Sequence, residues 1–144
     1  MNKVWAKASA ILLVVVSLIF NGTYALAASA TSTYIVTFQQ ATLVSNDHVG
    51  NDWAIAAQVA GQSISEGNSV KVKAKSGSSI KLYAYAEEQD KIPDVGEITK
   101  NVKVTSVSSK GSTVKLRVTI TENRGRYSGH QAVWEFTYKI KKQS

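Results

Sequence analysis

Apolar and polar residues alternate with a period of two along most of the chain beyond about residue 33. The alternation is strictest in Val70 to Ala74 and in Ile80 to Ala86, where lysines and tyrosines separate the apolar positions. Because successive side chains of a strand point to opposite faces, this period predicts half-buried β-strands. The predicted strands are 34–44, 53–60, 70–74, 80–86, 102–107, 114–120 and 132–140.

The segments between these strands are rich in Gly, Asn and Ser, which are typical turn residues. Seven to eight short strands at this spacing predict an all-β fold, an antiparallel two-sheet β-sandwich. Ala54 to Ala60 could be helical on propensity, but its alternation and its neighbours favour a strand. Trp134, Phe136 and Tyr138 alternate on the last strand, and we expect them to pack in the core.

The N-terminal segment has a different pattern. Lys3 and Lys7 precede an uncharged apolar run, Ala8 to Phe20, and residues 25–27 (Ala-Leu-Ala) fit the small-x-small pattern that signal peptidase recognises. A membrane anchor is the alternative, but a spanning helix needs about 20 apolar residues, more than this run contains. The pattern therefore predicts a secreted, extracellular protein, with no transmembrane segment after the signal peptide is cleaved.

The chain divides accordingly into three predicted parts. These are a cleaved signal peptide (1–27), a flexible leader (28–32) and a single β-sandwich domain (33–144). The domain has no cysteine, so disulfides cannot brace it as they do many small extracellular domains. We expect a good core, a bound metal ion or a partner to replace them, and such a composition suggests a bacterial protein.

The net charge of the chain indicates which classes of partner to expect. The net charge is +7, and only Lys3 and Lys7 leave with the signal peptide. A basic extracellular domain favours anionic surfaces such as cell-wall polymers or acidic lipids. An exported domain without a nucleic-acid-binding motif is not expected to bind nucleic acid.

Two connecting segments, 45–52 and 87–97, hold seven of the ten acidic residues. Calcium prefers six to eight oxygen ligands, which loops rich in Asp and Gly supply. If the two loops meet at one end of the sandwich, their carboxylates can converge on one Ca²⁺ ion. The expected metal ligands are Asp47, Asp52, Glu88, Asp90 and Asp94. The alternative is that they are ordinary acidic turns.

The acidic segments also carry a resemblance to C2 domains. Residues 47–53 (DHVGNDW) are similar to the first calcium loop of that family, D-x-x-G-x-x-D, one residue tighter. Residues 88–90 (EQD) and 94–97 (DVGE) stand for D-x-D and the closing part of its third loop. The resemblance covers about residues 43–104, with Glu88 in place of an Asp and with a Pro in a short third loop. It implies an eight-stranded sandwich that binds calcium at one end and docks on anionic lipid.

The lysine-rich strand is the second candidate site. Lys71, Lys73 and Lys75 point to one face of the strand at 70–74 and just beyond it, and Lys81 is expected beside them. A row of cations at this spacing suits a polyanion, either a lipid surface or a wall polymer such as teichoic acid. The alternative is that exposed lysines only keep the strand soluble and prevent edge pairing.

Catalysis is not expected. The chain has no G-x-S-x-G motif, and its only histidines are His48, inside the first acidic loop, and His130. His48 could add a nitrogen ligand to the metal site or simply occupy a turn. The sequence thus predicts a secreted, non-catalytic, calcium-binding module of the cell envelope. Two alternatives stay open: a metal-free protein-binding factor (an inhibitor, immunity protein or biofilm component), and a small secreted hydrolase or toxin.

Overall fold

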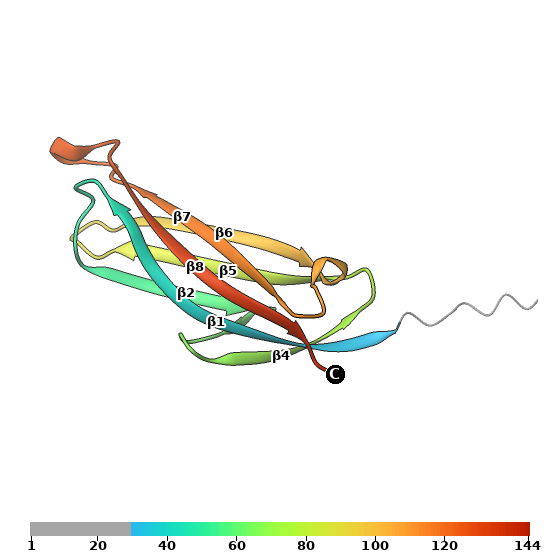
Figure 1. Ribbon diagram of the computed structural model, residues 1–144. Helices are drawn as coiled ribbons and strands as arrows, with labels where there is room; N and C mark the ends of the chain where they lie inside the picture. The colour runs from blue at the N-terminus through green and yellow to red at the C-terminus, as the bar shows by residue number, and fades with distance from the viewer. Residues whose placement is uncertain (1–29) are drawn as a thin grey trace, which may run out of the picture.

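Residues 30–144, the part of the protein that the computed structural model describes, form two antiparallel four-stranded sheets packed face to face (Figure 1). The strands are β1 (Thr31–Asn46), β2 (Trp53–Val59), β3 (Gln62–Ser63), β4 (Ser69–Lys75), β5 (Ser79–Glu88), β6 (Asp94–Lys103), β7 (Ser112–Thr121) and β8 (Gln131–Lys142). One sheet has the order β4-β1-β8-β7 and the other has β3-β2-β5-β6. The predicted all-β antiparallel sandwich is confirmed, with eight strands.

The apolar positions of the period-two pattern are the ones buried in the core. Ile80, Leu82 and Ala84 of β5 are at most 1% exposed, and Phe136 and Tyr138 of β8 are fully buried. The alanine-rich segment is strand β2, as its alternation predicts. The buried Tyr138 hydroxyl donates a hydrogen bond to the Tyr83 carbonyl, 2.7 Å away, so this polar atom has a partner inside the core.

Strand β6 differs from the prediction. It begins at Asp94, eight residues before the expected strand 102–107, and Val104–Ser106 form a short 3-10 turn, η1. Its pairing with β5 runs without a break from Glu88↔Asp94 to Ser79↔Lys103. The polar run inside β6 shows no clean alternation because β6 is an edge strand, where positions that face the core are still reached by water.

The start of β6 is held against β7 by a close backbone approach. A Cβ atom on Gly96 would lie 2.4 Å from the Thr119 carbonyl oxygen and 2.9 Å from Val118 Cγ1. Only glycine leaves room for this contact. It fixes Asp94, two residues earlier, beside the connection between β7 and β8.

The N-terminal predictions fall partly outside the structure. The predicted signal peptide, 1–27, precedes the described residues. The predicted leader, 28–32, extends too far, because Thr31 and Ser32 already pair with Lys75 and Ala74. The hydrogen bonds to β4 make them strand rather than free chain. Within residues 30–144, no helix is long and apolar enough to span a membrane.

Three connections lie together at one end of the sandwich, the left-hand end in Figure 1. They join β1 to β2, β5 to β6, and β7 to β8, and the last contains a second 3-10 turn, η2 (Gly125–Tyr127). The backbone N–H of Gln89 donates to the Asp52 carbonyl at 2.7 Å, and that of Asp47 donates to the Gln131 carbonyl at 3.0 Å. The two acidic segments therefore do meet, and the β7–β8 connection joins them. We call this the loop end.

Candidate metal centre at the loop end

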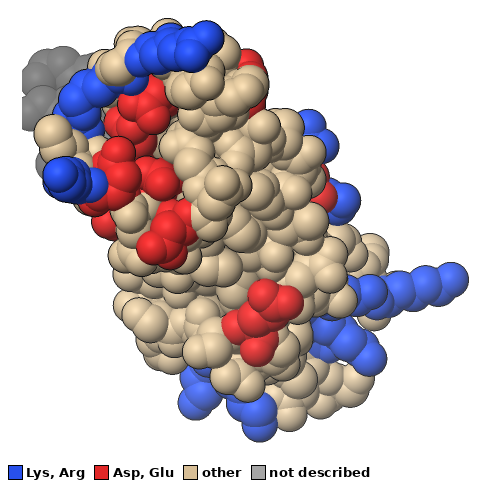
Figure 2. Space-filling view, turned by 90° about the vertical axis from the view of Figure 1, so that its left-hand side faces the viewer, with Lys and Arg blue, Asp and Glu red and all other residues tan. Residues whose placement is uncertain are grey.

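Two carboxylates are buried side by side at the loop end. Glu88 ends β5 and Asp94 begins β6, and the two residues are direct partners in the ladder. Their exposed fractions are 6% and 2%, which is unusual for carboxylates. Figure 2, which faces this end, shows acidic side chains gathered on one part of the surface with basic side chains at its margin.

Each of these carboxylates has an unsatisfied oxygen. Glu88 Oε2 and Asp94 Oδ2 are buried without a hydrogen-bond partner. Asp94 Oδ1 accepts a hydrogen bond from Asn123 Nδ2 at 2.8 Å, and the nearest guanidinium nitrogen of Arg124 lies 3.9 Å from it. A buried charged oxygen without a partner is costly. The pair is therefore short of positive charge and of donors.

The residues around Glu88 add further negative charge to this buried pair. Burial raises the pKa of Glu88, and the negative charges of Asp90, Glu122, Asp94 and Asp52 raise it further, in that order. The neighbouring carboxylates thus act on one buried site from all three connections. A divalent cation among them would offset the repulsion and supply the missing partner.

The β1–β2 connection covers Glu88 with backbone. Gly50 has φ +136°, and a Cβ atom there would lie 2.1 Å from Glu88 Oε1. Asn46 shapes this connection, since its side-chain amide donates to the Gly50 carbonyl and its Oδ1 accepts from the Val49 N–H at 3.1 Å. Glycine at this position lets the main chain lie directly on the carboxylate.

Four of the five predicted metal ligands, Asp52, Glu88, Asp90 and Asp94, belong to this acidic cluster, in which Asp52 and Asp90 are exposed. Asp47 does not, because its carboxylate turns to the two histidines. Glu122, at the end of β7, belongs to the cluster and was missed. Only the strand order brings it there, and no local pattern marks it.

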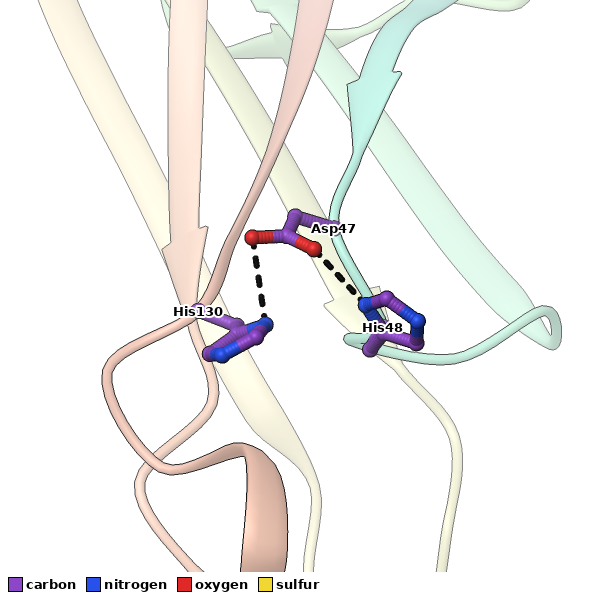
Figure 3. A group of neighbouring side chains, drawn as sticks. All are labelled: Asp47, His48 and His130. Atoms are coloured by element: carbon purple, nitrogen blue, oxygen red, sulfur yellow. Dashed lines mark hydrogen bonds and ion pairs between the residues drawn. The ribbon is translucent and has the colours of Figure 1, made fainter.

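The histidines form a separate cluster (Figure 3). Asp47 Oδ1 lies 2.7 Å from His48 Nδ1, and Asp47 Oδ2 lies 3.1 Å from His130 Nδ1, so one carboxylate spans both rings. The hydrogen bond with His48 lowers the pKa of Asp47; burial opposes this shift, and the charge of His130 adds to it. Among residues 30–144, this is the only group of three metal-ligating side chains whose ligand atoms all lie within 4.8 Å of one another. The oxygens of the acidic cluster are thus more widely spaced.

The predicted lysine face is divided between the two sheets. Lys71, Lys73 and Lys75 are exposed on β4 and alternate with half-buried or buried residues, so they lie on the outer face of their sheet. Lys81 is exposed on β5, in the other sheet, and does not join them. The pattern within a strand shows which side a lysine takes, but not which sheet the strand enters.

Pairing extends the lysine face in a way that the sequence did not show. Ile35 of β1 lies opposite both Lys71 of β4 and Lys141 of β8, so those two lysines share the outer face. The same register places further cations there from β7 and β8. We call the full set the basic face: Lys71, Lys73, Lys75, Lys115, Arg117, Lys139 and Lys141.

The raised pKa of Glu88 predicts a pH dependence of stability. Its folded-state pKa lies above the 4.5 of an ordinary glutamate, so the folded state binds the proton more tightly. The resulting stabilisation is complete below the unfolded pKa and is lost as the pH rises through the folded one. In EDTA, we therefore expect the wild type to lose stability relative to Glu88→Gln as the pH rises from about 4 to about 7. Urea unfolding at a series of pH values measures this, and parallel curves for the two proteins would contradict it.

The chain matches no protein-family model, and its sequence is not recognisably similar to that of any curated protein.

Proposed function

We propose that this protein is a secreted, non-catalytic binding module that holds Ca²⁺ at the loop end and attaches to an anionic surface of the cell envelope. The observation that carries the proposal is the buried pair Glu88 and Asp94, each with an oxygen that lacks a partner. A fold that buries two adjacent carboxylates in this way is stabilised by a cation between them.

The ligand chemistry favours calcium. The acidic cluster offers carboxylates from Asp52, Glu88, Asp90, Asp94 and Glu122, which are hard oxygen ligands. Calcium accepts six to eight oxygens in flexible geometry, whereas magnesium requires a tighter octahedron. Exposed Asp52 and Asp90 can move toward an ion that Glu88 and Asp94 hold. The two-sheet sandwich with its acidic connections at one end is also compatible with the C2-like resemblance of residues 43–104.

The basic face supplies the attachment surface. The four strands of its sheet carry only one acidic residue, Glu135, which lies 2.7 Å from Lys115 Nζ and 3.1 Å from Arg117 Nε. Among the described residues, the other five cations of this face form no ion pair. They are Lys71, Lys73, Lys75, Lys139 and Lys141.

Such a surface fits a regularly spaced polyanion. Lysines two residues apart along β4 are about 6.6 Å apart, and the register adds lysines across the sheet. Each lysine near an anionic surface contributes about 1 kcal/mol at ordinary salt. Five unpaired cations are therefore sufficient for measurable attachment to a wall polymer or to an acidic membrane.

Sedimentation with an anionic surface tests this function. The protein is mixed with a glycerol-phosphate wall polymer or, separately, with vesicles containing about one-third phosphatidylglycerol, in calcium and in EDTA. We expect binding that weakens with salt, and the triple variant Lys71→Gln, Lys73→Gln, Lys75→Gln should lose about tenfold or more in affinity. The arm that binds identifies the surface, and a calcium requirement shows whether the ion takes part in attachment.

The matched control removes the same charge from the other sheet. Lys81→Gln, Lys100→Gln and Lys103→Gln lie on β5 and β6, away from the basic face. Equal loss of binding in both triple variants would mean that net charge alone drives attachment. Absence of binding in both arms at low salt would overturn the surface-attachment part of the proposal.

A further inference from the structure

We infer that Asp47, His48 and His130 form a second metal site, which takes a borderline divalent transition ion such as Zn²⁺. One carboxylate lies between two imidazole nitrogens, at 2.7 Å from His48 Nδ1 and 3.1 Å from His130 Nδ1 (Figure 3). Zinc bonds to nitrogen and oxygen are about 2.0–2.1 Å, so neighbouring ligand atoms of a tetrahedral site lie about 3.3 Å apart. Small movements of the three side chains would therefore admit the ion. The inference does not rest on the calcium site.

The composition of the chain makes this arrangement specific. Zinc and its neighbours in the series bind through nitrogen and sulfur, and the chain has no cysteine and two histidines. His48 lies in the β1–β2 connection and His130 lies at the end of the β7–β8 connection. The fold brings the only two histidines of the sequence to the same carboxylate.

The His130 nitrogen is a second, separate observation. Its Nδ1 atom is shielded from solvent and faces Asp47 Oδ2 at 3.1 Å, but the two atoms do not form a well-aligned hydrogen bond. A shielded ring nitrogen that faces a carboxylate oxygen at this distance is placed to share a metal ion with it. A metal ion between the two atoms would satisfy both.

The surrounding contacts hold the three side chains in place. The ring of Tyr127 stacks on His48 with 4.6 Å between centroids, and it lies 5.5 Å from the ring of His130. The Asp47 N–H donates to the Gln131 carbonyl and so ties the β1–β2 connection to the start of β8, and the His130 N–H donates to the Tyr127 carbonyl within the β7–β8 connection. Such support orients ligands before the ion arrives and lowers the cost of binding.

One side of the site is open. A pocket of about 340 Å³ borders His48 and is lined by Asn46, Gly50, Asn51 and Tyr127. Three protein ligands leave a fourth position of a tetrahedral ion free for water or for a donor group of a partner. The site is thus suited to a zinc ion that bridges this protein to a second molecule.

Zinc titration of the protein, free of any polyhistidine tag and in excess calcium, tests the inference. Calorimetry should show one zinc ion per chain, and ¹⁵N spectra should show both imidazoles responding together, because no other histidine contributes signals. His130→Gln and, separately, His48→Gln should weaken binding at least tenfold. Glu66→Gln is the control, which should keep zinc affinity because Glu66 is an exposed carboxylate in the turn before β4, outside both the histidine cluster and the acidic cluster.

Three results would overturn the site. One is zinc binding that persists in the double variant His48→Gln, His130→Gln, which would place the ion on carboxylates. The second is a response of only one imidazole, and the third is no saturable binding at all. Near-ultraviolet circular dichroism of each variant checks that it is folded. A copper(II) spectrum with two coupled nitrogens would support the same ligands independently of affinity.

Discussion

Glu88→Gln is expected to raise the melting temperature in EDTA and to abolish the stabilisation by calcium. The wild type in about millimolar calcium, the range of weak extracellular sites, should melt several degrees higher than in EDTA. A ligand at about 100 times its dissociation constant adds about 2.7 kcal/mol to the stability, which moves the transition of a domain of this size by several degrees. The variant keeps the shape of Glu88 and removes its charge.

The two effects have one cause. Without a cation, the buried Glu88 carboxylate is repelled by its acidic neighbours and has an oxygen without a partner. An amide there removes the repulsion, so the variant should be more stable than the wild type in EDTA. The same amide is a poor ligand for calcium, so the variant should gain nothing when calcium is added.

Scanning calorimetry of both proteins in both conditions makes the measurement. Glu66→Gln is the matched control, because Glu66 is an exposed carboxylate in the turn before β4 and accepts a hydrogen bond from the Ala41 N–H, far from the loop end in sequence and sheet order. It should keep the wild-type response to calcium. A variant Glu88→Gln that still gains several degrees in calcium would overturn the acidic cluster as the calcium site, whatever the result at the histidines.

Gly96→Val is expected to cost about 3 kcal/mol or more of stability. Its Cβ would lie 2.4 Å from the Thr119 carbonyl oxygen and 3.0 Å from the Thr119 carbonyl carbon. Both are backbone atoms of β7, so relief requires β6 to move away from the opposite sheet. Because Asp94 is two residues away, the movement should also weaken its contact with Asn123 and lower calcium affinity.

Urea unfolding measures this cost. Thr99→Val is the control on the same strand, since Thr99 is exposed and pairs with Tyr83 on the outer side of its sheet. A β-branched apolar residue there should change stability by no more than about 0.5 kcal/mol. If Gly96→Val cost no more than the control, the close packing of β6 on β7 would be wrong.

The charge distribution unites the two proposed activities. Acidic side chains from three connections collect at the loop end, and the charged side chains on the outer face of one sheet are all basic except Glu135. A surface that attracts a polyanion would bring phosphate oxygens toward the protein, while a cation at the loop end lowers the local negative charge. Calcium could in this way favour attachment without contacting the lysines.

The sequence alone determined the secondary structure of most of the domain and its fold class. Period-two alternation indicates which residues of a strand face the core. It can be read from one short stretch of sequence, without knowing which strands are neighbours. It therefore identified the buried face of β5, the strand nature of alanine-rich β2 and the core positions Phe136 and Tyr138. It failed for the first part of β6, whose edge position removes the contrast between its two sides.

The tertiary structure alone decided which chemical groups meet. Period two says nothing of strand order or register, and those two properties placed Glu122 in the acidic cluster, turned Asp47 toward His130 and separated Lys81 from the basic face. Each of these outcomes depends on contacts between residues far apart in the chain. Hydrophobic burial determines how the sheets are arranged. That arrangement then determines which residues lie next to the loop carboxylates, the histidines and the lysines.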